Sequence, residues 1–281
     1  MARIARGMNL LAWCIRVFAK ALDGIGLVFC RAADLLWELL PAVLSPDRLA
    51  RQVQSRYESL YTPGRIPTKE ELQDDNLEAW EMDMLSRYRI NSGLLLAMGT
   101  GWGREALAIA RRGVTVVGVE ANPVAVRTAQ AFARQAGIPA YFHRADFTAL
   151  PYGEASFDFA LLATTMYSAI PGTERRQAWL GTVGRLLKPG GLLLLSFERE
   201  MPQPSRTKAI SRPLNALLHR LPGANRDYRP GDSYSAEHYM HVFQSEGEIR
   251  AELESARVHV RELRWAQGCA VVAFLATRSG T

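Results

Sequence analysis

The stretch LLLAMGTGWGREALAIARRGVTVVGVE, residues 94–120, decides the fold. It reads as a short apolar strand over residues 94–98, a loop with three glycines, a helix that ends at Gly113, and a second apolar strand over residues 114–120. Strand, glycine loop and helix in this order form a nucleotide-binding corner, because glycines let the backbone approach a ligand and the helix N-terminus offers free N–H groups. The spacing is G-x-G-x-G, with Arg104 where the dinucleotide fingerprint requires glycine.

Strands and helices continue to alternate beyond this corner. We predict helices at about 123–137 and 172–187, and strands at 140–146, 157–163 and 192–198. These strands lack polar alternation, which indicates a parallel sheet covered by helices on both faces. A helix at about 247–256 and strands at 258–265 and 269–277 end the chain. The sequence therefore predicts an α/β fold, a doubly wound, mostly parallel seven-stranded sheet with a C-terminal antiparallel hairpin and an N-terminal helical extension.

Two acidic side chains follow strands of this predicted sheet. Glu120 ends the second strand, where a carboxylate can accept hydrogen bonds from both hydroxyls of a ribose. Asp146 ends the third strand, where a carboxylate can hold an adenine amino group. Ordinary capping of the two loops is the alternative role. The glycine loop alone is weak evidence, but in register with these two carboxylates it predicts a nucleoside-binding site.

Three segments together resemble the class I S-adenosylmethionine-dependent methyltransferases, most closely the branch that acts on small molecules. They are the glycine-loop stretch above, FHRADFTALPYGEASFDFALLATTMYS at 142–168 and LLKPGGLLLLSF at 186–197. The resemblance covers about residues 76–198. It implies that Gly99, Thr100, Gly101 and Gly103 hold the methionine part of the cofactor, that Glu120 binds the ribose beside Ala121 and Asn122, that Asp146 and Phe147 contact adenine, and that Ala163 and Thr164 lie beside the sulfonium.

One position departs from the family pattern. Members often carry an acidic residue two positions before the first glycine, where it contacts the amino acid end of the cofactor, and this chain has Ala97 there. Three explanations are open: Glu81 or Glu105 substitutes, the cofactor binds less tightly, or the chain is a non-catalytic cofactor-binding pseudo-methyltransferase.

The motifs that would name a methyl acceptor are missing. Thr164-Thr-Met-Tyr167 stands where enzymes that methylate bases or glutamine carry [DN]-P-P-[YF], and there is no Pro-Cys nucleophile. A small-molecule acceptor remains, with O-methylation favoured. A hydroxyl acceptor needs a base of near-neutral pKa, so we predict His241, then His238, as the base, with Tyr167 lining the transfer point. For each histidine, packing within the lid is the competing role.

Arg175 and Arg176 open the helix beside the predicted site. They suit an acceptor carboxylate, or else form a solvated helix face.

The predicted domain organisation is an N-terminal helical extension or cap over residues 1–68 and a methyltransferase domain over 69–281. Residues 199–246 exceed what a connection needs, so we expect a lid insertion there. Short helices are expected over 47–61 and from a Thr68–Glu71 capping box to about residue 89.

The first 45 residues are apolar but interrupted by charges, so neither a membrane span nor a signal peptide is expected. An amphipathic pair of helices fits this pattern. Eight residues form its apolar face: Leu11, Cys14, Phe18, Leu22, Ile25, Phe29, Leu36 and Leu39. We expect that face to pack on the chain itself or on a twin subunit, as in a homodimer. Peripheral membrane contact through residues 8–44 is the alternative, with a membrane-surface enzyme acting on a lipid or isoprenoid.

Composition narrows the class of protein. The chain has 281 residues, 48% of them hydrophobic, and three scattered cysteines without a C-x-x-C pair. That usage excludes a disulfide framework and a cysteine-based zinc site, and it fits a cytoplasmic location. The net charge of +6 is spread along the chain, so nucleic-acid binding is not implied, and no metal is expected.

Overall fold

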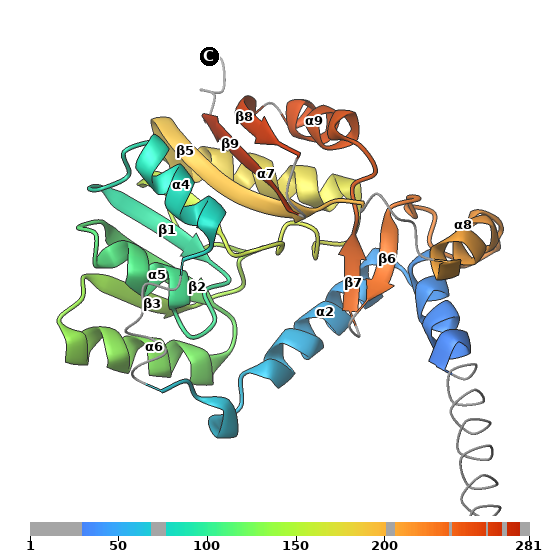
Figure 1. Ribbon diagram of the computed structural model, residues 1–281, viewed down its shortest axis with the longest axis horizontal. Helices are drawn as coiled ribbons and strands as arrows, with labels where there is room; N and C mark the ends of the chain where they lie inside the picture. The colour runs from blue at the N-terminus through green and yellow to red at the C-terminus, as the bar shows by residue number, and fades with distance from the viewer. Residues whose placement is uncertain are drawn as a thin grey trace, which may run out of the picture.

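The computed structural model describes residues 30–68, 77–200, 206–235, 238–256, 258–265 and 269–275. A seven-stranded sheet forms its centre, in the order β3-β2-β1-β4-β5-β9-β8 (Figure 1). The strands are β1 (Leu94–Met98), β2 (Thr115–Glu120), β3 (Ala140–Arg144), β4 (Phe157–Leu162), β5 (Leu187–Glu198), β8 (His259–Arg264) and β9 (Cys269–Leu275). Strands β1 to β5 pair in parallel, and β9 pairs antiparallel with β5 and β8. The predicted fold class is therefore confirmed, including the single reversed strand.

Each face of the sheet is covered by its own helices. Five helices follow or precede strands: α4 (Ala79–Arg87), α5 (Arg104–Ala110), α6 (Pro123–Ala136), α7 (Thr173–Leu186) and α9 (Glu246–Ser255). In β1, Leu95 and Ala97 pack with α4, α5 and α6, whereas Leu96 and Met98 pack with α7 and α9. This alternation follows from the two-residue period of a strand and makes β1 apolar on both faces. The two cores hold the carboxyl ends of β1, β2 and β4 in one rigid edge.

A second layer lies over that edge. It contains a helix over residues 30–43, α2 (Pro46–Leu60), a 3₁₀ turn over Pro63–Arg65, α8 (Arg206–Leu218) and the antiparallel pair β6 (Asp232–Ser235) and β7 (His238–His241). Figure 1 shows α2 running from this hairpin toward the start of α6, where Asn122 contacts the C-terminal end of α2.

The helix over residues 30–43 is joined to the insertion by specific contacts. Trp37 stacks on Tyr234 at a centroid distance of 5.2 Å, and Asn215 Nδ2 donates to the carbonyl of Glu38 at 2.8 Å. Ser233 Oγ donates to the Glu38 carboxylate at 2.8 Å. The described part of the N-terminal extension and the segment after β5 therefore form one packed unit.

Several local features of the structure differ from those predicted from the sequence. The capping box before α4 is formed by Glu78 and Glu81, while the predicted Thr68–Glu71 box lies largely outside the described residues. The predicted strand at 192–198 is extended at its N-terminal end, because β5 begins at Leu187 and bulges through residues 188–191. Of the predicted apolar stripe, Leu11 to Phe29 lie outside the described residues, and Leu36 is 66% exposed. Across the parts of the chain that the structure describes, no helix combines the length and apolarity needed to cross a bilayer.

Candidate active site

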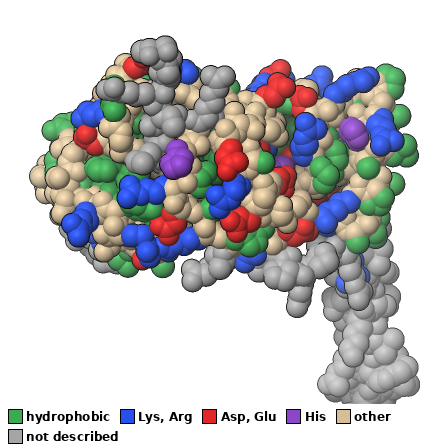
Figure 2. Space-filling view, turned by 90° about the horizontal axis from the view of Figure 1, so that it is seen from above, with side chains coloured by type: hydrophobic (Ala, Val, Ile, Leu, Met, Phe, Trp, Pro, Cys, Tyr) green, Lys and Arg blue, Asp and Glu red, His purple; other side chains and the backbone are tan. Residues whose placement is uncertain are grey.

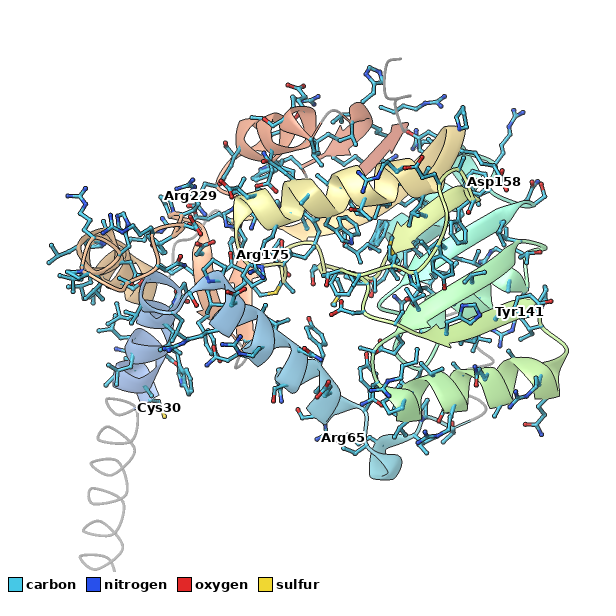
Figure 3. All side chains as sticks on the ribbon, turned by 180° about the vertical axis from the view of Figure 1, so that it is seen from behind. Cys30, Arg65, Tyr141, Asp158, Arg175 and Arg229 are labelled. Carbon is cyan, nitrogen blue, oxygen red and sulfur yellow. The ribbon has the colours of Figure 1, made fainter. Side chains whose placement is uncertain are left out.

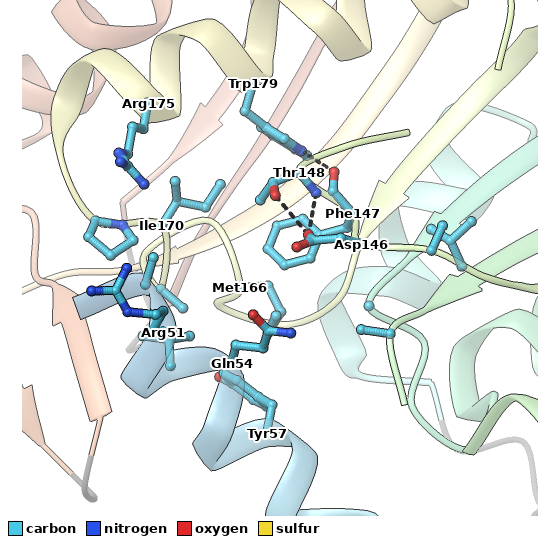
Figure 4. A pocket seen from close by; sticks show the side chains of 18 of the residues that line it. Arg51, Gln54, Tyr57, Asp146, Phe147, Thr148, Met166, Ile170, Arg175 and Trp179 are labelled. Atoms are coloured by element: carbon cyan, nitrogen blue, oxygen red, sulfur yellow. Dashed lines mark hydrogen bonds between the residues drawn. The ribbon is translucent and has the colours of Figure 1, made fainter. Parts of the chain in front are cut away.

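A cavity of about 510 Å³ lies at the carboxyl edge of the sheet, beneath α2 (Figure 4). Its floor comes from the ends of β1, β2 and β3 and from the segment after β4, and its roof comes from one face of α2. The roof residues are Asp47, Ala50, Arg51, Val53, Gln54, Tyr57, Glu58 and Tyr61. The floor and walls include Gly99, Glu120, Ala121, Asp146, Phe147, Met166, Ile170, Pro171, Arg175 and Trp179. Ligand sites of α/β sheets form at this edge, since the loops there leave a crevice.

The glycine loop is held against Glu120. The carboxylate of Glu120 accepts from Gly101 N at 3.0 Å and from Asn122 N at 2.8 Å. Gly103, at φ 90°, begins α5 in a left-handed conformation that suits glycine. Burial raises the pKa of Glu120, although the two backbone N–H groups oppose that rise. The site thus fixes an acidic acceptor at the end of β2, as the sequence predicts.

The C-terminal end of α2 closes the cavity beside this loop. A Cβ atom at Gly101 would lie 2.5 Å from Tyr61 Oη, so the tyrosine rests directly on the loop. The ring of Tyr61 meets Trp102 edge-on at 5.2 Å. Asn122 caps α6 through its Oδ1 and donates its Nδ2 to the carbonyls of Glu58 and Tyr61 at 3.2 and 3.3 Å. Asn122 therefore joins the loop edge to α2.

Asp146 and Phe147, which follow β3, line one wall of the cavity. Asp146 Oδ1 accepts from the backbone N–H and the hydroxyl of Thr148 at 2.8 and 2.7 Å, which orients the carboxylate. The Phe147 ring meets Trp179 edge-on at 6.3 Å, and Trp179 Nε1 donates to the Phe147 carbonyl at 2.9 Å. An oriented carboxylate beside two aromatic rings is a suitable wall for a heterocyclic base.

Buried polar atoms without a partner surround the glycine loop. Thr100 Oγ1, Glu105 Oε1 and Thr164 Oγ1 are enclosed and make no hydrogen bond with the described chain. Burial raises the pKa of Glu105 to about 8. Glu81, in contrast, forms a two-bond ion pair with Arg104 at 2.9 and 3.0 Å. Buried polar atoms of this kind suit a ligand that brings its own hydrogen-bond donors, so the loop fits a cofactor with an amino group.

The two arginines at the start of α7 separate. Arg175 points toward the space between α7 and α2 (Figure 3) and pairs with Asp47 across the cavity mouth. Arg176 has a side chain only 1% exposed and donates two hydrogen bonds to the Glu252 carboxylate at 2.8 and 2.7 Å. Only Arg175 is therefore available to a ligand.

The predicted catalytic residues do not meet at the cavity. His241 is 1% exposed, with Nδ1 2.8 Å from Asp232 and Nε2 3.2 Å from Glu248. Two carboxylates beside the two ring nitrogens favour the doubly protonated ring, and an imidazolium cannot act as a base. Burial and the nearby charge of Arg176 lower the pKa of His241. The two carboxylates raise it by more, so the net change is upward.

Of the other two predicted catalytic residues, Tyr167 does not line the cavity, and His238 contacts a residue that does. The hydroxyl of Tyr167, also fully buried, donates to Glu252 at 2.6 Å. His238 meets the cavity-lining Tyr57 edge-on at 5.5 Å.

Of the predicted cofactor residues, Gly99, Glu120, Ala121, Asp146 and Phe147 line the cavity directly. Thr100, Gly101, Gly103, Asn122, Ala163 and Thr164 lie near cavity-lining residues in sequence but do not line the cavity themselves. Sequence reasoning missed the roof, above all Tyr57 and Tyr61. The available signal was the spacing Asp47, Arg51, Gln54 and Glu58, which places polar side chains on one face of α2.

Comparisons with known proteins agree with this geometry. Residues 95–191 match the methyltransferase domain family. A methyltransferase of Synechocystis sp. is 31% identical over 101 residues, which are 36% of this chain and 45% of that protein. The ubiquinone biosynthesis O-methyltransferase of Methylobacterium nodulans is 25% identical over 166 residues, 59% of each chain. The chain thus spans about half the length of these curated relatives.

Solved structures share the fold. A methyltransferase from Methanosarcina mazei aligns with TM-score 0.56 and 22% identity over 69% of this chain and 98% of its own. A Burkholderia thailandensis 1,6-didemethyltoxoflavin-N1-methyltransferase, solved with its substrate and S-adenosylhomocysteine, aligns with TM-score 0.59 and 18% identity over 84% and 92%. Residues 95–191 therefore resemble a methyltransferase domain in sequence, and the solved structures share its fold. Among the described residues no group of three or more potential metal ligands occurs.

Proposed function

We propose that this chain transfers a methyl group from S-adenosylmethionine to a small-molecule acceptor bound in the cavity beneath α2. The observation that carries the proposal is the Glu120 carboxylate, fixed by Gly101 N at one end of a 510 Å³ cavity. When bound, the cofactor supplies an activated methyl group. The chain's part is to orient the acceptor, which can account for much of the rate of a transfer between two bound molecules.

Calorimetry with S-adenosylhomocysteine tests the cofactor part of this proposal. Removing the Glu120 side chain leaves two ribose hydroxyls poorly paired, which costs about 1–3 kcal/mol, or about 5- to 150-fold in affinity. We expect that loss in Glu120→Ala and no change in the control Glu154→Ala, an exposed acidic residue outside the cavity lining. A wild-type protein that does not bind S-adenosylhomocysteine, or an unchanged affinity in Glu120→Ala, would contradict the assignment.

Glu105 is our candidate for the acidic role that Ala97 leaves open. Its Oε1 is buried and makes no hydrogen bond with the described residues, although its Oε2 lies 3.7 Å from Arg104 Nε. Both oxygens of Glu81, in contrast, accept hydrogen bonds from Arg104. Glu105 also lies within electrostatic range of Glu120 and Tyr61, which border the cavity. We propose that Glu105 accepts the amino group of the cofactor.

We keep O-methylation as the proposed chemistry and His238 as its candidate base. The support is the edge-on contact between His238 and the cavity-lining Tyr57. We assign Tyr167 and His241 to positioning the segments that follow β4 and precede α9. Residues 1–68 and 199–246 are proposed as the acceptor cap.

A non-catalytic cofactor-binding role is the competing function that Ala97 prompts. Binding of S-adenosylhomocysteine without formation of a methylated product from metabolite fractions of the host would favour it.

A membrane-surface enzyme is the second candidate, because α8 exposes an apolar face. Ile210, Leu214 and Leu217 are 54%, 40% and 63% exposed, followed by Leu221 at 50%. Residues 206–220 contain no acidic residue. Figure 2 shows hydrophobic side chains among lysines and arginines at this end of the molecule. Basic amphipathic helices of this kind lie in membrane interfaces.

Flotation of the full chain with vesicles containing anionic lipid tests this candidate. Retention by vesicles that is lost in Leu214→Ser/Leu217→Ser would support it. A concentration-dependent dimer without flotation would favour a twin subunit on the same face, and the cytoplasm remains the proposed compartment in either case.

A further inference from the structure

Two guanidinium groups share the end of the cavity farthest from the glycine loop. Arg51 comes from α2 and Arg175 from α7, and both line the cavity (Figure 4). Arg175 pairs with Asp47, but Arg51 makes no hydrogen bond or ion pair with any described residue. One positive charge at this end is therefore left without a partner among the described residues.

The backbone around these arginines also favours an anion. A Cβ atom at Gly172 would lie 3.8 Å from the ring of Pro46, so the first turns of α7 and α2 meet at the cavity mouth. Helix N-termini carry positive partial charge, which adds to that of the two side chains. Asp47 offsets part of this field and holds Arg175 in place.

The proposed cofactor offers no phosphate that the two arginines would bind. Glu120 and Asp146 make the opposite end acidic, and an adenosine bound there carries no phosphate. Between the two ends lie the apolar side chains of Ala169, Ile170 and Met166. The cavity therefore has an acidic end, an apolar middle and a basic end.

We propose that Arg51 and Arg175 bind a carboxylate of the methyl acceptor, so that the acceptor class is an organic acid with an apolar or aromatic body. This inference rests on the proposed function, because it takes the acidic end as the cofactor site. The planar fork of arginine matches a carboxylate with two parallel hydrogen bonds. The apolar middle then directs the uncharged part of the acceptor toward Met166 and Gly99.

Binding of benzoate, with benzamide as the neutral isostere, tests the inference in ligand-observed NMR titrations. The protein is used with and without saturating S-adenosylhomocysteine. The variant is Arg51→Gln/Arg175→Gln. The matched control is Arg48→Gln/Arg185→Gln, which removes the same charge from α2 and α7 at positions outside the cavity lining.

We expect wild type to prefer benzoate to benzamide by about tenfold or more, and the cavity variant to lose that preference while the control keeps it. Equal binding of the two probes to wild type, or an unchanged preference in the cavity variant, would overturn the inference. A drop of more than threefold in S-adenosylhomocysteine affinity in the cavity variant would also overturn it, since the arginines would then serve the cofactor.

The two proposals fail in different ways. If wild type does not bind S-adenosylhomocysteine, the proposed function fails. The benzoate titration of the ligand-free protein still decides whether the arginines form a carboxylate site.

Discussion

We expect the substitution Glu105→Gln to raise the stability of the protein at high pH and to weaken its binding of the cofactor. Burial raises the pKa of Glu105 from 4.5 to about 8, a difference of about 3.5. At about 1.4 kcal/mol for each pKa unit, an ionised Glu105 lowers the free energy of unfolding by up to about 5 kcal/mol. A raised carboxyl pKa means that this loss is absent below pH 4.5 and grows as pH rises toward 8. Glutamine has nearly the same shape and never ionises.

The variant should therefore match wild type at pH 5 to within about 1 kcal/mol and exceed it by several kcal/mol at pH 9. Urea unfolding at both pH values, followed by circular dichroism, measures the difference. Cofactor affinity should move the other way, since the amide cannot supply a charge to an ammonium group. We expect a loss of about 10-fold or more for S-adenosylhomocysteine at pH 7.

Proton release gives a third readout for the same residue. If Glu105 ionises on meeting the amino group, wild type releases a proton on binding at pH 7, below its pKa of about 8. Calorimetry in buffers of different ionisation enthalpy should detect that proton in wild type and not in Glu105→Gln. A variant as stable as wild type at both pH values, or one with unchanged affinity and proton release, would refute the assignment.

Three further predictions concern buried contacts. Glu252→Gln leaves Arg176 buried without its anion, and we expect a loss of about 3–5 kcal/mol in urea unfolding, with Glu254→Gln on the same helix near neutral. His241→Ala should destabilise more at pH 6 than at pH 9, because a raised histidine pKa contributes stability below 6.5 that is lost as pH rises through the folded value; a larger loss at pH 9 would contradict this. Gly101→Ala should weaken S-adenosylhomocysteine binding, since its Cβ would meet Tyr61, and Tyr61→Ala in the same chain should restore part of that loss.

The sheet could be predicted because its signals are local. Each strand from β1 to β5 is a short, mainly apolar run followed by a glycine, a turn or a helix start. The predicted bounds differ from the observed ones by at most two residues, except at β5. The extra residues of β5 come from pairing with β4 across a bulge, which is a contact between strands that a linear pattern does not encode.

The role of His241 is harder to predict because it depends on partners far from any motif. His241 lies in a segment rich in histidine and tyrosine, which suggested a base. Its actual neighbours are Asp232, brought opposite by the β6–β7 pairing, and Glu248, in the first turn of α9. Both are ordinary acidic residues in the sequence, and only the hairpin register together with the packing of α9 brings them to the two sides of the ring.

Helix α2 contributes residues to both ends of the cavity. Its first turns carry Arg51 at the basic end, and its C-cap Tyr61 rests on the glycine loop at the acidic end. One rigid helix thus lies over both ends of the cavity and fixes the distance between them. Asn122 fastens the far end of that helix to the loop that follows Glu120. A shift of α2 would move the arginine and the tyrosine together. If the proposed sites hold, we therefore expect acceptor and cofactor binding to be energetically coupled through this helix.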